Sequence, residues 1–172
     1  LELSGKRCDL VISGGVDTLN DIFMFMCFSK THALSPTGDA RPFSKDADGT
    51  VLGEGVGMVV LKRLEDARRE GDRIYAVIRG MGTSSDGRSQ SIYAPRSEGQ
   101  AEALRRAYVL SGVDPDTVEL VEAHGTGTTV GDVVEFGALE KVYREAKPRE
   151  TWCALGSVKS QIGHTKAAAG VA

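Results

Sequence analysis

Two short loops of this sequence carry the residue types that could do chemistry, and each contains a histidine. In the first, residues 121–136 (VEAHGTGTTVGDVVEF), His124 ends an apolar run and is followed by three glycines and three threonines. In the second, residues 157–170 (SVKSQIGHTKAAAG), His164 lies forty positions after His124, with Lys159 upstream. Imidazole donates or accepts a proton near neutral pH, and threonine hydroxyls donate and accept hydrogen bonds. Both loops are therefore candidate catalytic loops.

Strand patterns precede both histidines and determine where their side chains should lie. Residues 118–123 (VELVEA) predict a buried strand, and residues 152–158 (WCALGSV) predict the last strand. The carboxyl ends of parallel strands meet at one edge of an α/β sheet, which is where such sheets place ligand sites. If His124 and His164 donate to one developing oxyanion, their nearest ring nitrogens should lie within roughly 6–7 Å of each other. A pair of merely structural histidines has no reason to converge in this way.

The polar residues near the histidines should surround this point. We expect both loops to open onto one concavity, with Thr126 and Thr128 along its mouth and Lys159 behind His164. The glycines of the first loop resemble a dinucleotide-binding loop only superficially. Their spacing is not GxGxxG, and the strand CALGSV ends without an acidic residue for a ribose hydroxyl. Nucleotide binding is therefore disfavoured.

The rest of the chain alternates strand and helix patterns. Further strands are expected at residues 9–12, 57–64 and 74–80, and further helices at residues 64–71 and from Ser97 to near Gly112. Two capping boxes, Ser97 with Gln100 and Asp132 with Glu135, should begin the helices that follow them. The alternation predicts an α/β fold with a largely parallel sheet.

Two further segments differ from the rest in composition. Residues 22–30 (IFMFMCFSK) are apolar all round, which favours a buried core or an interface over the lining of an acyl-chain or cofactor site. Residues 35–53 are rich in proline, glycine, aspartate and serine, a composition typical of loops. A loop of this length inside a compact domain is often functional.

The overall composition excludes several classes of protein. With 172 residues, 41% hydrophobic and 26% charged, the chain has the balance of a globular protein. A net charge of −3 gives no basic footprint for nucleic acid, and no apolar run reaches membrane-spanning length. Cys8, Cys27 and Cys153 form no CxxC pair, so neither a disulfide framework nor a metal site is indicated. A reducing, cytoplasmic compartment is expected.

Four stretches of the sequence resemble a known family. VEAHGTGTTVGD and SVKSQIGHTKAAAG resemble the two histidine motifs of β-ketoacyl synthases, the condensing domains of fatty-acid and polyketide synthases. Residues 40–64 resemble the glycine-rich stretch that joins the two halves of such a domain, and residues 84–100 resemble its following loop and helix start. The resemblance covers the whole chain. It implies a thiolase-like fold, in which two similar α/β halves stack in five layers.

On this resemblance, the sequence is expected to be an internal fragment of a longer synthase. Leu1 is no initiator, and the sequence stops inside an alanine-rich run. Residues 1–64 would be the end of the N-terminal ketosynthase half, and residues 65–172 most of a truncated C-terminal half. The pieces THALSPTGDARPFSKDADGTVLGEG and WCALGSVKSQIGHTKAAAG look closest to iterative type I synthases of the polyunsaturated-fatty-acid, glycolipid or enediyne kind.

The resemblance also implies roles for individual residues. His124 and His164 match the two catalytic histidines of the family, and Lys159 matches the lysine that supports the second. Thr126 and Thr128 match the threonines that contact the phosphopantetheine arm of the carrier protein.

Two acidic residues and one missing residue complete this comparison. Asp132 and Glu135 match acidic positions of the family and are expected to be structural at the site. The family's nucleophilic cysteine belongs to a short Cys-Ser motif, and none of the three cysteines here sits in one. We therefore expect the nucleophile upstream of Leu1.

The reaction implied is decarboxylative Claisen condensation of malonyl-carrier protein with an enzyme-bound acyl chain, in fatty-acid or polyketide biosynthesis. The partners implied are an acyl carrier protein domain, malonyl and acyl thioesters, and a second copy in a homodimer. No directly bound cofactor is expected, because the phosphopantetheine arm belongs to the carrier protein. Two alternatives remain open: a non-catalytic condensing-fold subunit of the chain-length-factor kind, and a thiolase-like enzyme acting on coenzyme A esters.

The residue types suit this chemistry. Decarboxylation of a malonyl thioester develops an enolate, and condensation passes through a tetrahedral oxyanion, so both steps need donors aimed at oxygen. A neutral imidazole N–H can serve as such a donor. The positive end of a helix beginning after His164 would lower the pKa of that histidine and keep it neutral.

Overall fold

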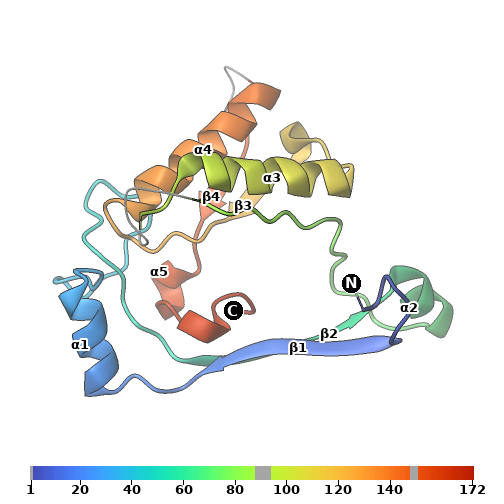
Figure 1. The fold of residues 1–172 in the computed structure, drawn as a ribbon, viewed down its shortest axis with the longest axis horizontal. Helices are drawn as coiled ribbons and strands as arrows, with labels where there is room; N and C mark the ends of the chain where they lie inside the picture. Colours follow the sequence, from blue (N-terminus) through green and yellow to red (C-terminus); the bar gives the residue numbers. More distant parts are fainter. Residues whose placement is uncertain (1, 88–93, 148–150) are drawn as a thin grey trace.

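A computed structural model describes residues 2–87, 94–147 and 151–172, which form two small sheets with helices around them (Figure 1). The strands are β1 (Leu10–Asp17), β2 (Gly55–Lys62), β3 (Leu120–Glu122) and β4 (Ala154–Gly156). The helices are α1 (Ile22–Lys30), α2 (Leu64–Glu70), α3 (Ser97–Ser111), α4 (Gly131–Ala146) and α5 (Lys159–Ile162), with 3-10 turns η1 (Pro115–Thr117) and η2 (Lys166–Ala168). In Figure 1, α3 and α4 lie over β3 and β4, and the β1–β2 ribbon lies on the opposite side.

The ribbon of β1 and β2 is antiparallel, with Leu10 opposite Lys62 and Asp17 opposite Gly55. The prediction of a largely parallel sheet is wrong for this pair. The connection of residues 18–54 leaves β1 and enters β2 at the same end of the ribbon. No crossover is made, and the strands therefore run in opposite directions.

The second sheet is a parallel pair joined through a helix. Leu120 pairs with Ala154 and Glu122 with Gly156, and α4 forms the crossover between β3 and β4. Both strands fall within the predicted ranges and are shorter than predicted. The buried core beside them is Ala101, Ala138 and Val142, where α3 packs on α4. Small side chains at this contact allow the two helices to approach closely.

Two apolar segments lack the partners that their predicted burial requires. Residues 74–80 form no strand, which corrects that prediction, and Tyr75 is 83% exposed there. The continuation of this segment lies against α3, where a Cβ on Gly82 would come within 1.8 Å of the carbonyl oxygen of Ala103. Helix α1 has no buried residue, and Phe23 is 67% exposed, so α1 is not part of a core formed by the described residues. Its role as an interface stays a prediction.

The predicted carboxyl ends of α2 and α3 are confirmed. Gly71 and Gly112 adopt the left-handed conformation that ends α2 and α3, as predicted. The capping box at Ser97 is wrong, because Arg96 is the N-cap and no side chain caps α3. The Ser97 hydroxyl instead donates to Glu98 and accepts from Lys141. Among the described residues, no helix combines the length and the apolar character needed to cross a bilayer.

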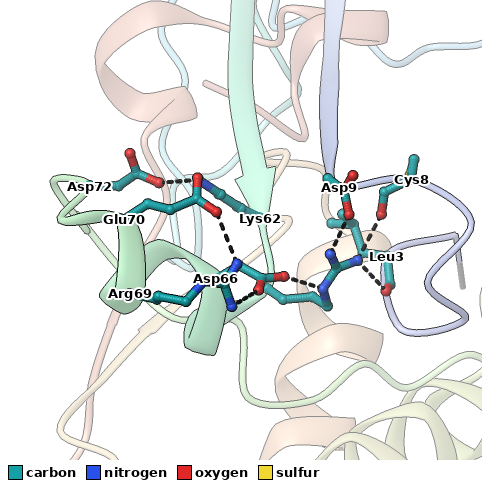
Figure 2. A network of polar contacts seen from close by, with 9 residues as sticks. Leu3, Cys8, Asp9, Lys62, Asp66, Arg69, Glu70 and Asp72 are labelled. Carbon is teal, nitrogen blue, oxygen red and sulfur yellow. Dashed lines mark hydrogen bonds and ion pairs between the residues drawn. The ribbon is translucent and has the colours of Figure 1, made fainter.

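A polar network around Arg63 joins the start of the chain to α2 (Figure 2). One terminal nitrogen of Arg63 donates to the carbonyl oxygens of Leu3, at 3.1 Å, and Cys8, at 2.7 Å. The other binds Asp9 at 2.6 Å, while Nε contacts Asp66. The planar guanidinium satisfies four acceptors at once. The hydrogen bonds and positive charges of Arg69 and Arg63 lower the pKa of Asp66.

We predict that Arg63→Ala lowers the melting temperature more than Arg63→Lys does, because lysine keeps the charge and loses the fork geometry. The measurement is thermal unfolding followed by circular dichroism. Arg7→Ala is the matched control, since Arg7 is 74% exposed in its side chain and its ion pair is with Glu2. Equal melting temperatures for Arg63→Ala and Arg7→Ala would show that the network contributes nothing.

Candidate active site

The two loop histidines meet in space. The ring centroids of His124 and His164 lie 5.4 Å apart, with an interplanar angle of 84° in an edge-to-face arrangement. The predicted convergence of the two rings is therefore confirmed. His124 is exposed, and His164 is half-buried.

Two carboxylates from α4 hold the His124 loop. Glu135 accepts from the backbone N–H groups of His124, at 2.7 Å, and Gly125, at 2.8 Å. Asp132 accepts from Gly127 N–H at 3.0 Å and from Phe43 N–H at 2.7 Å. The predicted capping box is wrong, because the N-cap of α4 is Val130 and no side chain caps it. The carboxylates bind the preceding loop instead, at the helix end where negative charge is favoured.

The glycines of this loop are required by conformation and space. Gly125 and Gly127 have φ angles of +40° and +76°, which side-chain-bearing residues rarely adopt. A Cβ on Gly125 would lie 2.5 Å from the Cβ of Ser157, and one on Gly127 would lie 2.7 Å from the carbonyl oxygen of Gly49. The loop can pack against its neighbours only because these positions lack side chains.

One extended segment, residues 49–53, hydrogen-bonds both histidine loops. Gly49 N–H donates to Gly127 O at 2.9 Å. His164 N–H donates to Val51 O at 2.7 Å, and Gly53 N–H donates to His164 O at 3.0 Å. The segment belongs to the long loop whose composition suggested a functional role. No sequence signal identified the residues that it would contact.

The hydrogen bonds of His164 determine which of its ring nitrogens carries a proton. The backbone N–H of Lys166 donates to Nδ1 of His164 at 3.0 Å. In the neutral ring, an accepting Nδ1 leaves the proton on Nε2. His164 can therefore donate a hydrogen bond from Nε2 without being charged.

Both imidazoles favour the neutral form. Burial lowers the pKa of His164 to about 4, helped by the positive charges of His124, Lys159 and Lys166 and opposed by Asp17. The pKa of His124 is also lowered, first by partial desolvation and then by Lys159. The predicted direction for His164 is confirmed. The predicted cause, the positive end of a helix after His164, is wrong, because only the three-residue turn η2 follows this histidine. The main cause is burial.

Lys159 and the two threonines lie near the histidines. Lys159 is buried, and its charge acts on both rings. The hydroxyls of Thr126 and Thr128 lie 3.0 Å apart and, with His124, line a cavity of about 720 Å³. His164 is not among the described residues that line this cavity. The prediction of one concavity shared by both rings is therefore not met here, since His164 is held by its own loop and by residues 49–53.

The cysteines and the second cavity offer no alternative centre. All three cysteines are free thiols, and burial raises the pKa of Cys153, which disfavours the nucleophilic thiolate. Cys153 lines a smaller cavity of about 150 Å³ with Tyr143 and Trp152, and no histidine of the described ranges lines it. Within the described part of the chain, no group of three or more histidine, cysteine or acidic side chains could hold a metal ion.

Two parts of the chain match two parts of one family. Residues 2–67 match the description "Beta-ketoacyl synthase, N-terminal domain", and residues 75–172 match "Beta-ketoacyl synthase, C-terminal domain". The chain therefore belongs to the β-ketoacyl synthase family. The division between residues 64 and 65 stays a prediction.

Individual relatives agree with this family. A phenolphthiocerol/phthiocerol polyketide synthase subunit of Mycobacterium tuberculosis is 49% identical over 170 residues, covering 99% of this chain and 9% of that protein. A polyunsaturated fatty acid synthase subunit of Thraustochytrium sp. is 50% identical over 175 residues, covering 99% of this chain and 6% of that protein. The chain thus spans less than a tenth of the length of these relatives.

A solved structure agrees as well. The "Ketosynthase from module 6 of the bacillaene synthase from Bacillus subtilis 168" has a TM-score of 0.95 and 42% identity, covering 99% of this chain and 31% of that chain. The predicted thiolase-like α/β fold is therefore confirmed.

We predict that Asp132→Ala destabilises the protein by about 2 kcal/mol or more, because it leaves the amides of Phe43 and Gly127 without their acceptor. Urea unfolding measures the loss, and faster hydrogen exchange of these two amides locates it. Asp132→Asn should cost less, since one oxygen remains. Glu119→Ala, at an exposed carboxylate, is the control. Unchanged exchange at Gly127 in Asp132→Ala would contradict the proposed tether.

The pKa of His164 predicts a pH dependence of stability. Its value of about 4 lies below the ordinary 6.5, so the unfolded chain binds more protons in this window. The contribution of His164 to the free energy of unfolding is therefore complete above about pH 6.5 and is lost as the pH falls through about 4. Urea unfolding of wild type and His164→Asn across this range checks the sign. Identical pH slopes would contradict the lowered pKa.

Proposed function

We propose that His124 and His164 form the oxyanion-stabilising centre of a β-ketoacyl synthase that catalyses decarboxylative Claisen condensation of malonyl-carrier protein with an enzyme-bound acyl chain. The observation that carries this proposal is the meeting of two imidazoles, 5.4 Å apart between centroids, that both favour the neutral form. Membership of the β-ketoacyl synthase family supports it.

The reaction needs hydrogen-bond donors at two stages. When the malonyl carboxylate leaves as CO₂, the electron pair of the broken bond passes into the thioester as an enolate. The enolate carbon then attacks the acyl thioester, and the resulting tetrahedral oxyanion collapses with loss of the enzyme thiolate. Donors fixed in place stabilise both oxygens without reorganising at the moment of reaction. The Nε2–H of neutral His164 is such a donor.

Lys159 contributes through its charge. It is buried near both rings and lowers the pKa of each. We assign it the role of keeping both histidines neutral, so that each ring donates a hydrogen bond without becoming charged. The carboxylates of Asp132 and Glu135 are committed to backbone amides, which makes them structural at the site.

Thr126 and Thr128 are proposed to contact the phosphopantetheine arm. Their hydroxyls line the same cavity as His124 and can donate to or accept from the amides of such an arm. The partners proposed are therefore an acyl carrier protein domain and its malonyl and acyl thioesters, with no cofactor bound directly. A cytoplasmic homodimer is proposed for the intact protein.

We predict that His124→Ala and His164→Ala each lower condensation by about a hundred- to a thousandfold, the usual effect of losing one oxyanion donor. The test uses the full-length synthase, acylated first and then given malonyl-carrier protein, so that acylation and condensation are measured separately. Initial acylation should be less affected in both variants.

His32→Ala is the control, since His32 is the remaining histidine and is exposed. Wild-type condensation rates in either test variant would remove that histidine from the mechanism. If a wild-type synthase shows neither acylation nor condensation, the non-catalytic subunit is the better assignment.

A further inference from the structure

Lys166 is a residue for which the proposed mechanism has no role, although its backbone binds His164. Its φ angle is +46°, in the left-handed region that residues with side chains rarely adopt. From this conformation its N–H donates to Nδ1 of His164 at 3.0 Å. An unfavourable backbone conformation persists only where surrounding contacts hold it.

The side chain of Lys166 supplies those contacts. Its ammonium group donates to Asn20 Oδ1 at 2.5 Å and to the carbonyl oxygen of Gly53 at 3.1 Å. It also forms an ion pair with Asp17 Oδ1 at 3.1 Å, and the side chains of Lys166 and Asp17 are only 10% and 15% exposed. An ammonium has three donors, and each has an acceptor here.

These three acceptors come from two parts of the chain that are far apart in the sequence. Asp17 ends β1, Asn20 precedes α1, and Gly53 belongs to the segment that also pairs with the His164 backbone. The side chain of Lys166 therefore fixes residue 166 against the same segment, residues 49–53, that holds the backbone of His164. A side chain that only covered surface would not need three polar partners.

We propose that Lys166 is a positioning residue for His164: its shielded ammonium anchors residue 166 in the left-handed conformation, from which the backbone N–H fixes the ring with its proton on Nε2. The importance of this tautomer for condensation rests on the proposed function. The tautomer itself can be measured without any reaction.

The charges of Lys166 and Asp17 have a second effect, on the pKa of His164, which can be measured separately from the tautomer. The groups that act on His164 are His124, Lys159 and Lys166, which lower its pKa, and Asp17, which raises it. Removing the lysine charge should raise the pKa of His164, and removing the aspartate charge should lower it further. Neutral substitutions of Lys166 and of Asp17, the two members of one ion pair, should therefore shift the pKa of His164 in opposite directions.

The experiment is ¹⁵N NMR of the histidine-labelled full-length protein, with His164 identified by the loss of its signals in His164→Asn. In wild type the Nε2–H tautomer should exceed the other by roughly tenfold, the factor that one hydrogen bond supports. Lys166→Met keeps the aliphatic stem without donors. It should reduce this excess toward the smaller ratio that a free neutral histidine side chain shows in water, and it should raise the pKa of His164.

Two further variants separate the possible causes. Lys141→Met makes the same change at a lysine of α4 that pairs with Glu98, and should leave both readouts as in wild type. Asp17→Asn keeps an acceptor for the ammonium, so it should retain the tautomer and lower the pKa. It also tests the proposal if Lys166→Met fails to fold, because a pKa of His164 that rises in folded Asp17→Asn would show that this ion pair does not act on the ring as proposed.

An unchanged tautomer excess in folded Lys166→Met would overturn the inference, even if its melting temperature falls, because the lysine would then be only structural. Condensation by Lys166→Met should fall by about 10- to 100-fold, as when groups that orient metal-binding histidines are removed. A shifted tautomer with undiminished condensation would support the positioning role and count against the proposed role of His164.

Discussion

The site depends on one constraint, the hydrogen bonding of residues 49–53 to both histidine loops. Gly49 binds the loop of His124 through Gly127. Val51 accepts from the N–H of His164, and Gly53 donates to its carbonyl oxygen. Backbone pairing of this kind fixes position without using a side chain. Because the segment is short and extended, the distance between its two contacts is nearly constant. The segment therefore ties the His124 loop and the His164 loop to each other.

The charged groups at the site affect both the loop geometry and the pKa values of the rings. The carboxylates of Asp132 and Glu135 are used on backbone amides, where they shape the His124 loop. The ammonium groups of Lys159 and Lys166 are shielded from solvent; Lys159 lowers the pKa of both rings, and Lys166 lowers that of His164. Neutral imidazoles in a partly dehydrated setting can donate hydrogen bonds that are stronger than those in water. Glu135 and Asp132 also raise the pKa of His124, so on that ring the loop-binding carboxylates oppose Lys159.

The same site also explains the unusual backbone conformations of its loops. Positive φ angles occur at Gly125, Gly127 and Gly163, where the missing side chain makes them easy, and at Lys166, where it does not. The glycines let the chain turn closely around its neighbours. At Lys166 the cost is offset by a side chain with three polar partners. The strained residue donates its backbone N–H to His164 and so constrains that ring.

Local conformation and the residue types of the site follow from the amino-acid sequence. The strand patterns around β3 and β4, the glycine ends of α2 and α3, and the positions of the two histidine loops are correct predictions, because periodicity and backbone preference act within a few residues. The convergence of His124 and His164 also follows, from the rule that parallel strands deliver their loops to one edge.

What those local pieces bind depends on the packing of the whole chain. Asp132 and Glu135 have the spacing of a capping box, yet their carboxylates reach loop amides, since a better set of donors lies within range. Residues 74–80 have the composition of a strand and pair with no described strand. The side chain of Lys166 hydrogen-bonds to Asn20, which is 146 positions away in the sequence, and to Gly53, which is 113 positions away. Sequence patterns cannot identify such partners, because each contact forms only when segments far apart along the chain are brought together by the fold.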